Sequence, residues 1–410
     1  MNKIRPLLIF TTLASLTLSC ENMDQKVAKI HNHAFTIDTH VDTPYQLLDE
    51  NFDIGISHSF EPGGSRVDFP RMKEGGLDGI FFAAFTSQRE RTVENILAAR
   101  NKADELIDSI YSACTKYSNL AEVAVTVEDA YRLEKEGKRA IFIGMENGFP
   151  IGKEISEVER YFKRGVRYIT LCHSSNNDIC DSSTDKNGAE FDGLSPFGEK
   201  VLDKMNELGI LVDVSHVSDS SFFDAVERSK TPVIASHSGA RAICDHPRNM
   251  SDEMLKALAN NGGVIQLCIL DDYIKAPDTT ALIFKKEQEL HNRYKNAGSM
   301  SKEDEDKMWA EWHQLQIDYP KDKPSVADAV DHIDHIVSLI GIDHVGIGTD
   351  FDGGGGLKDC VDVSQLKNIT IELLKRNYSE EDITKIWGGN FMRVFKQVTD
   401  YARNEKLASN

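Results

Sequence analysis

The chain has 410 residues, of which 40% are hydrophobic and 28% are charged. This length exceeds that of a minimal domain, and it fits one large α/β barrel with insertions or two ordinary domains. The 66 acidic side chains outnumber the 47 basic ones, for a net charge of −19. Such a surface repels the phosphate backbone of nucleic acids, so no nucleic-acid partner is expected.

The N-terminal segment, residues 1–20, predicts export. Lys3 and Arg5 precede an apolar stretch that is too short to span a bilayer, and a serine and Cys20 follow it. This order is typical of a signal peptide. Cys20 also resembles a lipoprotein processing site, although Thr17 stands where such sites usually have leucine. We expect a periplasmic protein or a lipoprotein of a bacterial envelope, anchored to the membrane only through Cys20. The alternative is an ordinary secretory signal with an incidental cysteine.

Short apolar runs predict eight strands along the rest of the chain. Most are continuously apolar, as expected of parallel strands that are buried on both faces. They lie at 35–40, 79–86, 140–145, 168–173, 210–216, 232–237, 263–269 and 344–350.

Helix-like segments alternate with these strands, which indicates βα units in a parallel sheet. Several of them begin at a capping serine. They lie at 91–117, 195–208, 218–228, 251–260, 325–340 and 379–398. Eight strands in a chain of this length predict a (β/α)8 TIM barrel with inserted loops and helices, formed as a single domain by residues 35–400.

Some segments do not fit the repeat. The polar stretch 174–193 and the charged stretch 270–324 are interpreted as insertions, the second with helix-like patches at 282–294 and 302–315. Residues 21–34 are interpreted as a linker and N-terminal segment, and 401–410 as a C-terminal tail that frays from residue 404. The WGGN motif at 387–390 is expected to pack the closing helix.

Six of the predicted strands end in histidine or aspartate, or run directly into glutamate. These residues are His40, Asp42, Glu146, His173, His216, His237 and Asp350. Catalytic groups of such barrels gather at the C-terminal ends of the strands. His40 and Asp42 lie two residues apart and so share one face of a strand. Imidazole and carboxylate together suit zinc or another first-row ion, and burying them without a cation would be costly. The pattern therefore predicts a metal site.

The same regions carry longer motifs. In chain order they are IDTHVDTP, RVDFPRMKEGGLDGIFFAAF, GMENGFPIG, YITLCHSSNN, GLSPFGEKVLDKMNELGILVDVSHVS, PVIASHSGARAICDHPRNMSD, HVGIGTDFDG and WGGNFMRV. In content and order they resemble the membrane (renal) dipeptidase family, which comprises binuclear zinc dipeptidases of the amidohydrolase superfamily. The resemblance extends from about Phe35 to Val398. It implies a dipeptidase that acts on small dipeptides as a homodimer.

The resemblance also implies a ligand set for two Zn²⁺ ions per chain. His40 and Asp42 would bind one ion, and His216 and His237 the other. Glu146 would bridge both. Two such ions lower the pKa of a bridging water and so supply hydroxide at neutral pH.

Three more residues would handle the substrate. His173 matches the histidine that contacts the scissile carbonyl. Arg248 matches the arginine that binds the C-terminal carboxylate of the dipeptide, a group suited to its planar fork. Asp350 matches the aspartate that moves protons, and it is preferred to Asp352 because it stands at the strand end. Residues 353–356 are expected to form a turn beside the site, since no Lys-Ser/Thr follows them to make a phosphate loop.

Two alternatives remain open on sequence. A deacetylase, lactonase or deaminase of the amidohydrolase superfamily could use the same barrel, but such enzymes often bridge their metals with a carbamylated lysine, and this chain offers Glu146. Arg248 also favours a substrate that carries a carboxylate. A binding lipoprotein that has lost the reaction should lack a ligand, and none is missing.

Overall fold

A computed structural model describes residues 22–60, 64–294, 302–319 and 322–408. The predicted signal at 1–20, with Cys20, lies outside these residues, and export and lipidation stay predictions. Among the helices of the described residues, none combines the length and apolarity needed to cross a membrane.

The predicted (β/α)8 barrel is confirmed, with all eight expected strands. In sheet order the parallel strands are β1 (Ile37–Val41), β2 (Gly79–Phe85), β4 (Arg139–Glu146), β5 (Val166–Thr170), β6 (Leu211–Asp213), β7 (Ile234–Ser238), β8 (Val264–Leu267) and β9 (Val345–Ile347). A ninth strand, β3 (Ala121–Val123), was not predicted and pairs with β4. The ring closes where Val41 bridges to Phe351, just after β9, and where the amide of Asp350 donates to the carbonyl of His40 at 3.0 Å.

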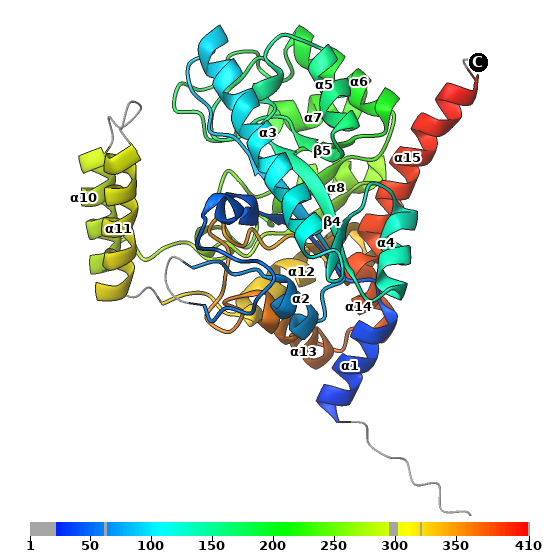
Figure 1. Cartoon of the computed structure of the whole chain (residues 1–410), viewed down its shortest axis with the longest axis vertical. Coiled ribbons are helices and arrows are strands. Elements are labelled where there is room, and N and C mark those ends of the chain that lie inside the picture. Colours follow the sequence, from blue (N-terminus) through cyan, green and yellow to red (C-terminus); the bar gives the residue numbers. More distant parts are fainter. Residues whose placement is uncertain (1–21, 61–63, 295–301, 320–321, 409–410) are drawn as a thin grey trace, which may run out of the picture.

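Helices surround this barrel (Figure 1). Those expected from sequence are present as α3 (Val93–Lys116), α6 (Pro196–Leu208), α7 (Asp219–Arg228), α8 (Asp252–Asn261), α12 (Val326–Ile340), α14 (Glu380–Thr384) and α15 (Asn390–Ala408). The last two are joined by a π-helical turn, Lys385–Gly389. Shorter helices that were not predicted are α2 (Phe69–Gly75), α4 (Val127–Lys135), α5 (Ser156–Lys163), α9 (Asp271–Ile274) and α13 (Lys367–Lys375).

Both ends of the described chain differ from prediction. Residues 22–34 are not an extended linker: α1 (Met23–His33) begins at a capping box on Asn22 and docks through His31, whose Nε2 lies 2.8 Å from the hydroxyl of Thr370. The predicted tail is also wrong, because α15 continues to Ala408 with Ala402 buried. Apolar contacts on one helical face hold both segments against the domain.

Aromatic rings fill the end of the barrel at which the strands begin. Phe81 stacks on Phe142 and on Tyr168, with ring centroids 4.9 and 5.0 Å apart. Phe391 and Phe395 of α15 meet this stack edge-on. Because α15 closes this end with apolar side chains, the interior opens only toward the C-terminal ends of the strands.

The segment 270–324, which the sequence predicts to be an insertion, carries a helical hairpin in its described residues. Its helices are α10 (Leu282–Tyr294) and α11 (Lys302–Asp318). They lie side by side at the edge of the molecule, away from the barrel (Figure 1, yellow).

The WGGN motif packs the closing helix, as expected. Trp387 is fully buried and donates from its indole nitrogen to Thr370 at 2.7 Å. Asn390 donates to the carbonyls of Ile342 and Val345 at 2.7 and 2.9 Å. Gly388 lies against the backbone of Phe35, and a Cβ added there would come 2.0 Å from the Phe35 carbonyl oxygen. This close approach requires glycine.

We predict that Gly388→Ala lowers the free energy of unfolding by about 2 kcal/mol, because a backbone atom cannot move aside for the new methyl group. Gly389→Ala is the matched control: the position is exposed, and the added Cβ meets nothing closer than 3.4 Å. We expect this control to be neutral or slightly stabilising. Urea unfolding midpoints of the two variants would test the contact, and equal midpoints would contradict it.

Candidate active site and metal centre

The carboxylate of Glu146 lies at the centre of a group of imidazoles. Its Oε2 atom is 3.2 Å from Nε2 of His40. Its Oε1 atom is 3.0, 3.4 and 3.7 Å from Nε2 of His216, His237 and His173. The two oxygens of one buried carboxylate thus face different sets of histidines.

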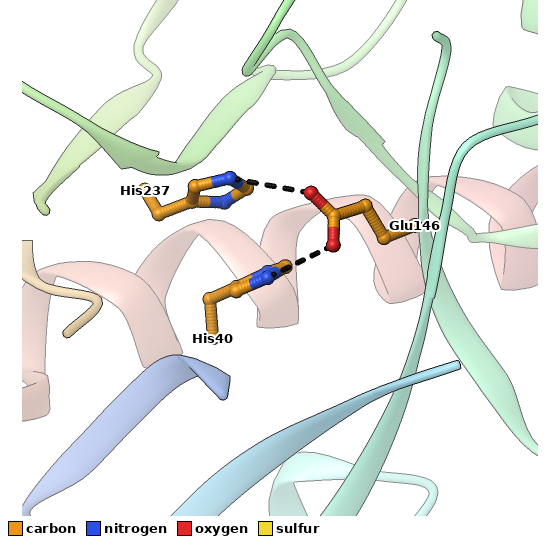
Figure 2. A group of neighbouring side chains, drawn as sticks. All are labelled: His40, Glu146 and His237. Atoms are coloured by element: carbon orange, nitrogen blue, oxygen red, sulfur yellow. Dashed lines mark ion pairs between the residues drawn. The ribbon is translucent and has the colours of Figure 1, made fainter. Parts of the chain in front are cut away.

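The barrel geometry explains this convergence. Figure 2 shows His40, Glu146 and His237 pointing toward one another from β1, β4 and β7. His173 and His216 are each the third residue after the end of β5 and of β6. Parallel strands end on one rim, so residues far apart in the sequence meet there.

A pair of carboxylates, Asp42 and Asp350, borders this group. Ligand atoms of His40, Asp42 and Asp350 all lie within 4.8 Å of one another. Gly353, in the turn predicted beside the site, leaves room for them: a Cβ there would lie 2.1 Å from Oδ2 of Asp42 and 2.3 Å from Oδ1 of Asp350. Asp352 points elsewhere and accepts hydrogen bonds from Thr43, Ser65 and the amide of Arg66.

Two site residues have a left-handed backbone. φ is +70° at His216 and +62° at Asp350. Neither is glycine, so each position costs conformational energy that the surrounding structure must offset. Both side chains are thereby turned toward the rim immediately after their strands.

Two residues that sequence reasoning missed orient the histidines from behind. The hydroxyl of Tyr168 lies 2.8 Å from Nδ1 of His40, and that of Ser236 lies 2.9 Å from Nδ1 of His237. In both rings Nε2 faces Glu146. Polar residues within otherwise apolar strands were the available signal, but which ring nitrogen they meet depends on the packing of neighbouring strands.

Burial and mutual charge shift the pKa values strongly. Burial alone would raise the pKa of Glu146, but the neighbouring imidazoles of His40, His216 and His237 hold it well below the usual range. Burial lowers the pKa of His216 and of His237 well below that of free histidine, with help from nearby positive charge. Burial and the neighbouring Asp42 carboxylate raise the pKa of Asp350. Neutral imidazoles beside an ionised carboxylate are ready-made metal ligands.

These residues fit a metal. His40 Nε2 and Asp42 Oδ1 are both buried and make no hydrogen bond. Leaving such atoms without a partner is costly, and a cation between them would remove the cost. Ligand sets of three or more donors occur around Glu146 in two combinations and around Asp42 in a third. Imidazole nitrogen with carboxylate oxygen is a donor set that zinc accepts.

Arg248 and His173 both border this centre. Arg248 is only 4% exposed, and its guanidinium donates to the carbonyl of His237 at 3.0 Å and lies over the ring of Tyr273. Among the described residues, no carboxylate forms an ion pair with it, and its Nε atom has no partner. His173 is partly exposed and packs its ring against Phe85, 4.7 Å away.

The structure therefore brings together all eight residues predicted from sequence. Other histidines lie elsewhere: His31 contacts Thr370, and His335 pairs with Asp252 on the outer helices. The loop after β5 also borders a polar cavity of about 430 Å³, between residues 88–91 and 175–190. The catalytic and ligand roles of the eight residues stay predictions.

Comparison with known proteins identifies the family of the chain. Residues 24–409 match the model of the membrane dipeptidase family, peptidase family M19. An uncharacterised dipeptidase of Schizosaccharomyces pombe is 30% identical over 396 residues, covering 92% of this chain and 83% of that protein.

Solved structures agree as well. A probable dipeptidase, PvdM, from Pseudomonas aeruginosa has a TM-score of 0.80 at 28% identity, covering 92% of this chain and 99% of that one. A metallopeptidase from Rhodobacter sphaeroides, liganded with a phosphinate mimic of L-Ala-D-Ala, shares the fold with a TM-score of 0.71 at 20% identity, covering 88% and 99%. The family match and the curated relative favour dipeptide hydrolysis over the deacetylase and lactonase alternatives. The chain belongs to the membrane dipeptidase family, peptidase family M19, and is a hydrolytic dipeptidase.

Proposed function

We propose that this dipeptidase works with two zinc ions and cleaves dipeptides that carry a free C-terminal carboxylate. The observation that carries the proposal is the position of Glu146. One of its oxygens faces His40, which is close to Asp42, and the other faces His216 and His237. A carboxylate placed in this way can bridge two cations, each completed by its own pair of side chains.

The metals would supply a Lewis acid for the peptide carbonyl and a water acidic enough to attack it at neutral pH. The protein must hold the ligands, exclude competing water and orient the dipeptide. Because His40, Glu146 and His237 are almost fully buried, their charges act in a medium of low polarity, where electrostatic effects are strong.

Arg248 supports the choice of a carboxylate substrate. Its guanidinium is buried next to the second ligand pair without a carboxylate partner from the described chain. A buried, uncompensated charge is costly, and a substrate carboxylate would compensate it with two parallel hydrogen bonds. A free C-terminus one residue from the scissile bond satisfies this requirement.

His173 and Asp350 are placed to stabilise negative charge and to transfer protons during the reaction. His173 lies 3.7 Å from Glu146 and remains partly open to solvent, so it can donate to the carbonyl oxygen of a bound dipeptide. Asp350 lies beside Asp42, and burial together with that neighbour raises its pKa. A carboxyl group tuned upward in this way can accept a proton from the attacking water and pass it to the leaving amine.

We predict about two zinc ions per chain by elemental analysis. His216→Ala and Asp42→Ala should each lose zinc and hydrolysis together, because each removes one ligand of a different ion. His335→Ala is the control, since this histidine pairs with Asp252 outside the site. A folded His216→Ala variant with full activity and depleted zinc would contradict the metal mechanism.

Arg248→Lys should raise KM for free dipeptides about 10- to 100-fold, because a lysine cannot form the paired hydrogen bonds of a guanidinium. The panel should contain L-L and L-D dipeptides and their C-terminal amides, for which we expect little cleavage by either enzyme. The control is Arg241→Lys, in the same loop, where Arg241 pairs with Asp219. Equal cleavage of acids and amides by the wild-type enzyme would argue against the role of Arg248.

Asp350→Asn should keep zinc and lower kcat by roughly 100-fold or more, because the amide cannot accept a proton. Asparagine adopts the left-handed backbone readily, so the fold should tolerate this change. Rates and zinc content measured on one sample test this role. Wild-type turnover would remove Asp350 from proton transfer.

A further inference from the structure

A fully buried carboxylate lies one step behind the metal ligands. Asp213 ends β6, and in the described part of the chain it forms no ion pair. It accepts four hydrogen bonds instead. Its Oδ1 atom accepts from the amides of Ser236 and Ser215 at 2.8 and 3.1 Å. Its Oδ2 atom accepts from the hydroxyls of Ser236 and Thr170 at 2.6 and 2.5 Å.

The directions of these hydrogen bonds determine which ring nitrogen of His237 carries the hydrogen. Ser236 has a single hydroxyl hydrogen, which it donates to Asp213. The hydroxyl oxygen of Ser236 also lies 2.9 Å from Nδ1 of His237. Because its hydrogen is already donated to Asp213, this oxygen can only accept a hydrogen bond from Nδ1. Nδ1 of His237 must carry the ring hydrogen, and Nε2, which lies 3.4 Å from Glu146 and 2.9 Å from Nε2 of His216, is left with a lone pair.

We propose that Asp213 and Ser236 are positioning residues for the second metal: together they hold the ring of His237 and keep its Nε2 available as a ligand. This inference rests on the proposed zinc function. Metal-bound histidines commonly donate their other ring N–H to an oxygen that fixes tautomer and orientation. Here the hydroxyl of Ser236 supplies that oxygen. The carboxylate of Asp213 accepts the hydroxyl hydrogen and so sets the direction of the bond to His237.

Two other residues of the chain, Asp38 and His216, show what distinguishes the pair of Asp213 and Ser236. Asp38 binds the amide and hydroxyl of Thr349 at 2.9 and 2.5 Å, just as Asp213 binds Ser236, but the Thr349 hydroxyl meets a backbone amide rather than a ring. His216, the other predicted ligand of the second ion, has no hydrogen-bond partner at Nδ1. Of the two predicted histidine ligands of the second ion, only His237 would therefore have its ring held by a hydrogen bond at Nδ1.

Replacing the carboxylate with an amide should reverse the chain of hydrogen bonds. The amides of Ser215 and Ser236 require an oxygen at the Oδ1 position, so Asp213→Asn would place its NH₂ group against the Ser236 hydroxyl. That hydroxyl would then accept from the amide and donate to Nδ1 of His237. The ring hydrogen would move to Nε2, where it blocks metal binding.

The test is zinc affinity, measured by elemental analysis after dialysis against buffers of graded free zinc. In Ser236→Ala, one of two zinc ions should bind 10- to 100-fold more weakly while the other is unchanged. In Asp213→Asn, the same ion should weaken at least as much. Thr170→Val is the matched control: it removes a hydroxyl from the same carboxylate but leaves the path to His237 intact, so both ions should stay.

Ser236→Ala with both zinc ions bound as tightly as in the wild type would overturn the proposal, and so would equal weakening in Thr170→Val. Thermal unfolding of the metal-free proteins separates these outcomes from general damage to the fold. A wild-type protein that binds no zinc would instead defeat the proposed two-zinc function.

Discussion

The contact on which the structure depends is that between one carboxylate and four imidazoles. Glu146 is 3% exposed, and a histidine nitrogen approaches it from each of four other chain segments. Burying so many polar groups is costly unless they satisfy one another or a cation. Only a closed ring of parallel strands brings these segments to one point. The bridge between Val41 and Phe351, which closes that ring, is thus as necessary to the site as the site side chains themselves.

Seen along its axis, the barrel is divided into three levels. Apolar rings from β2, β4, β5 and α15 fill the end where strands begin. Carboxylates and hydroxyls such as Asp213 and Thr170 occupy the middle. The histidines lie at the top. Tyr168 joins the levels, because its ring stacks in the apolar layer while its hydroxyl reaches His40. The rigidity of a packed core is in this way transmitted to His40, a predicted ligand.

The residues of the site were predictable because their pattern is local. Six of the eight apolar runs end in histidine or aspartate or run into glutamate, which marks their strand ends, and eight apolar runs imply a barrel. What orients the ligands was not predictable. The bond from Tyr168 to His40 joins positions 128 residues apart, and no spacing in the sequence records it.

Short elements were missed for a related reason. β3 has three residues and is defined only by its pairing with β4. The segment before β1 was interpreted as a linker because its polar composition conceals a narrow apolar face, Val27 and Ile30, which becomes evident only against its partner helices. In both cases tertiary contacts decide the conformation, as they often do for marginal helices and strands.

The left-handed backbone at His216 and Asp350 has a consequence for evolution. Most residues with a Cβ cost about 1 kcal/mol or more in this conformation, Asn, Asp and His less than the others, whereas glycine adopts it freely. The predicted ligand and the predicted proton carrier therefore occupy positions where the backbone conformation favours glycine. Under selection for thermal stability alone, these positions should drift toward glycine early. Natural or laboratory lineages freed from the need for catalysis would then keep the barrel and lose the reaction.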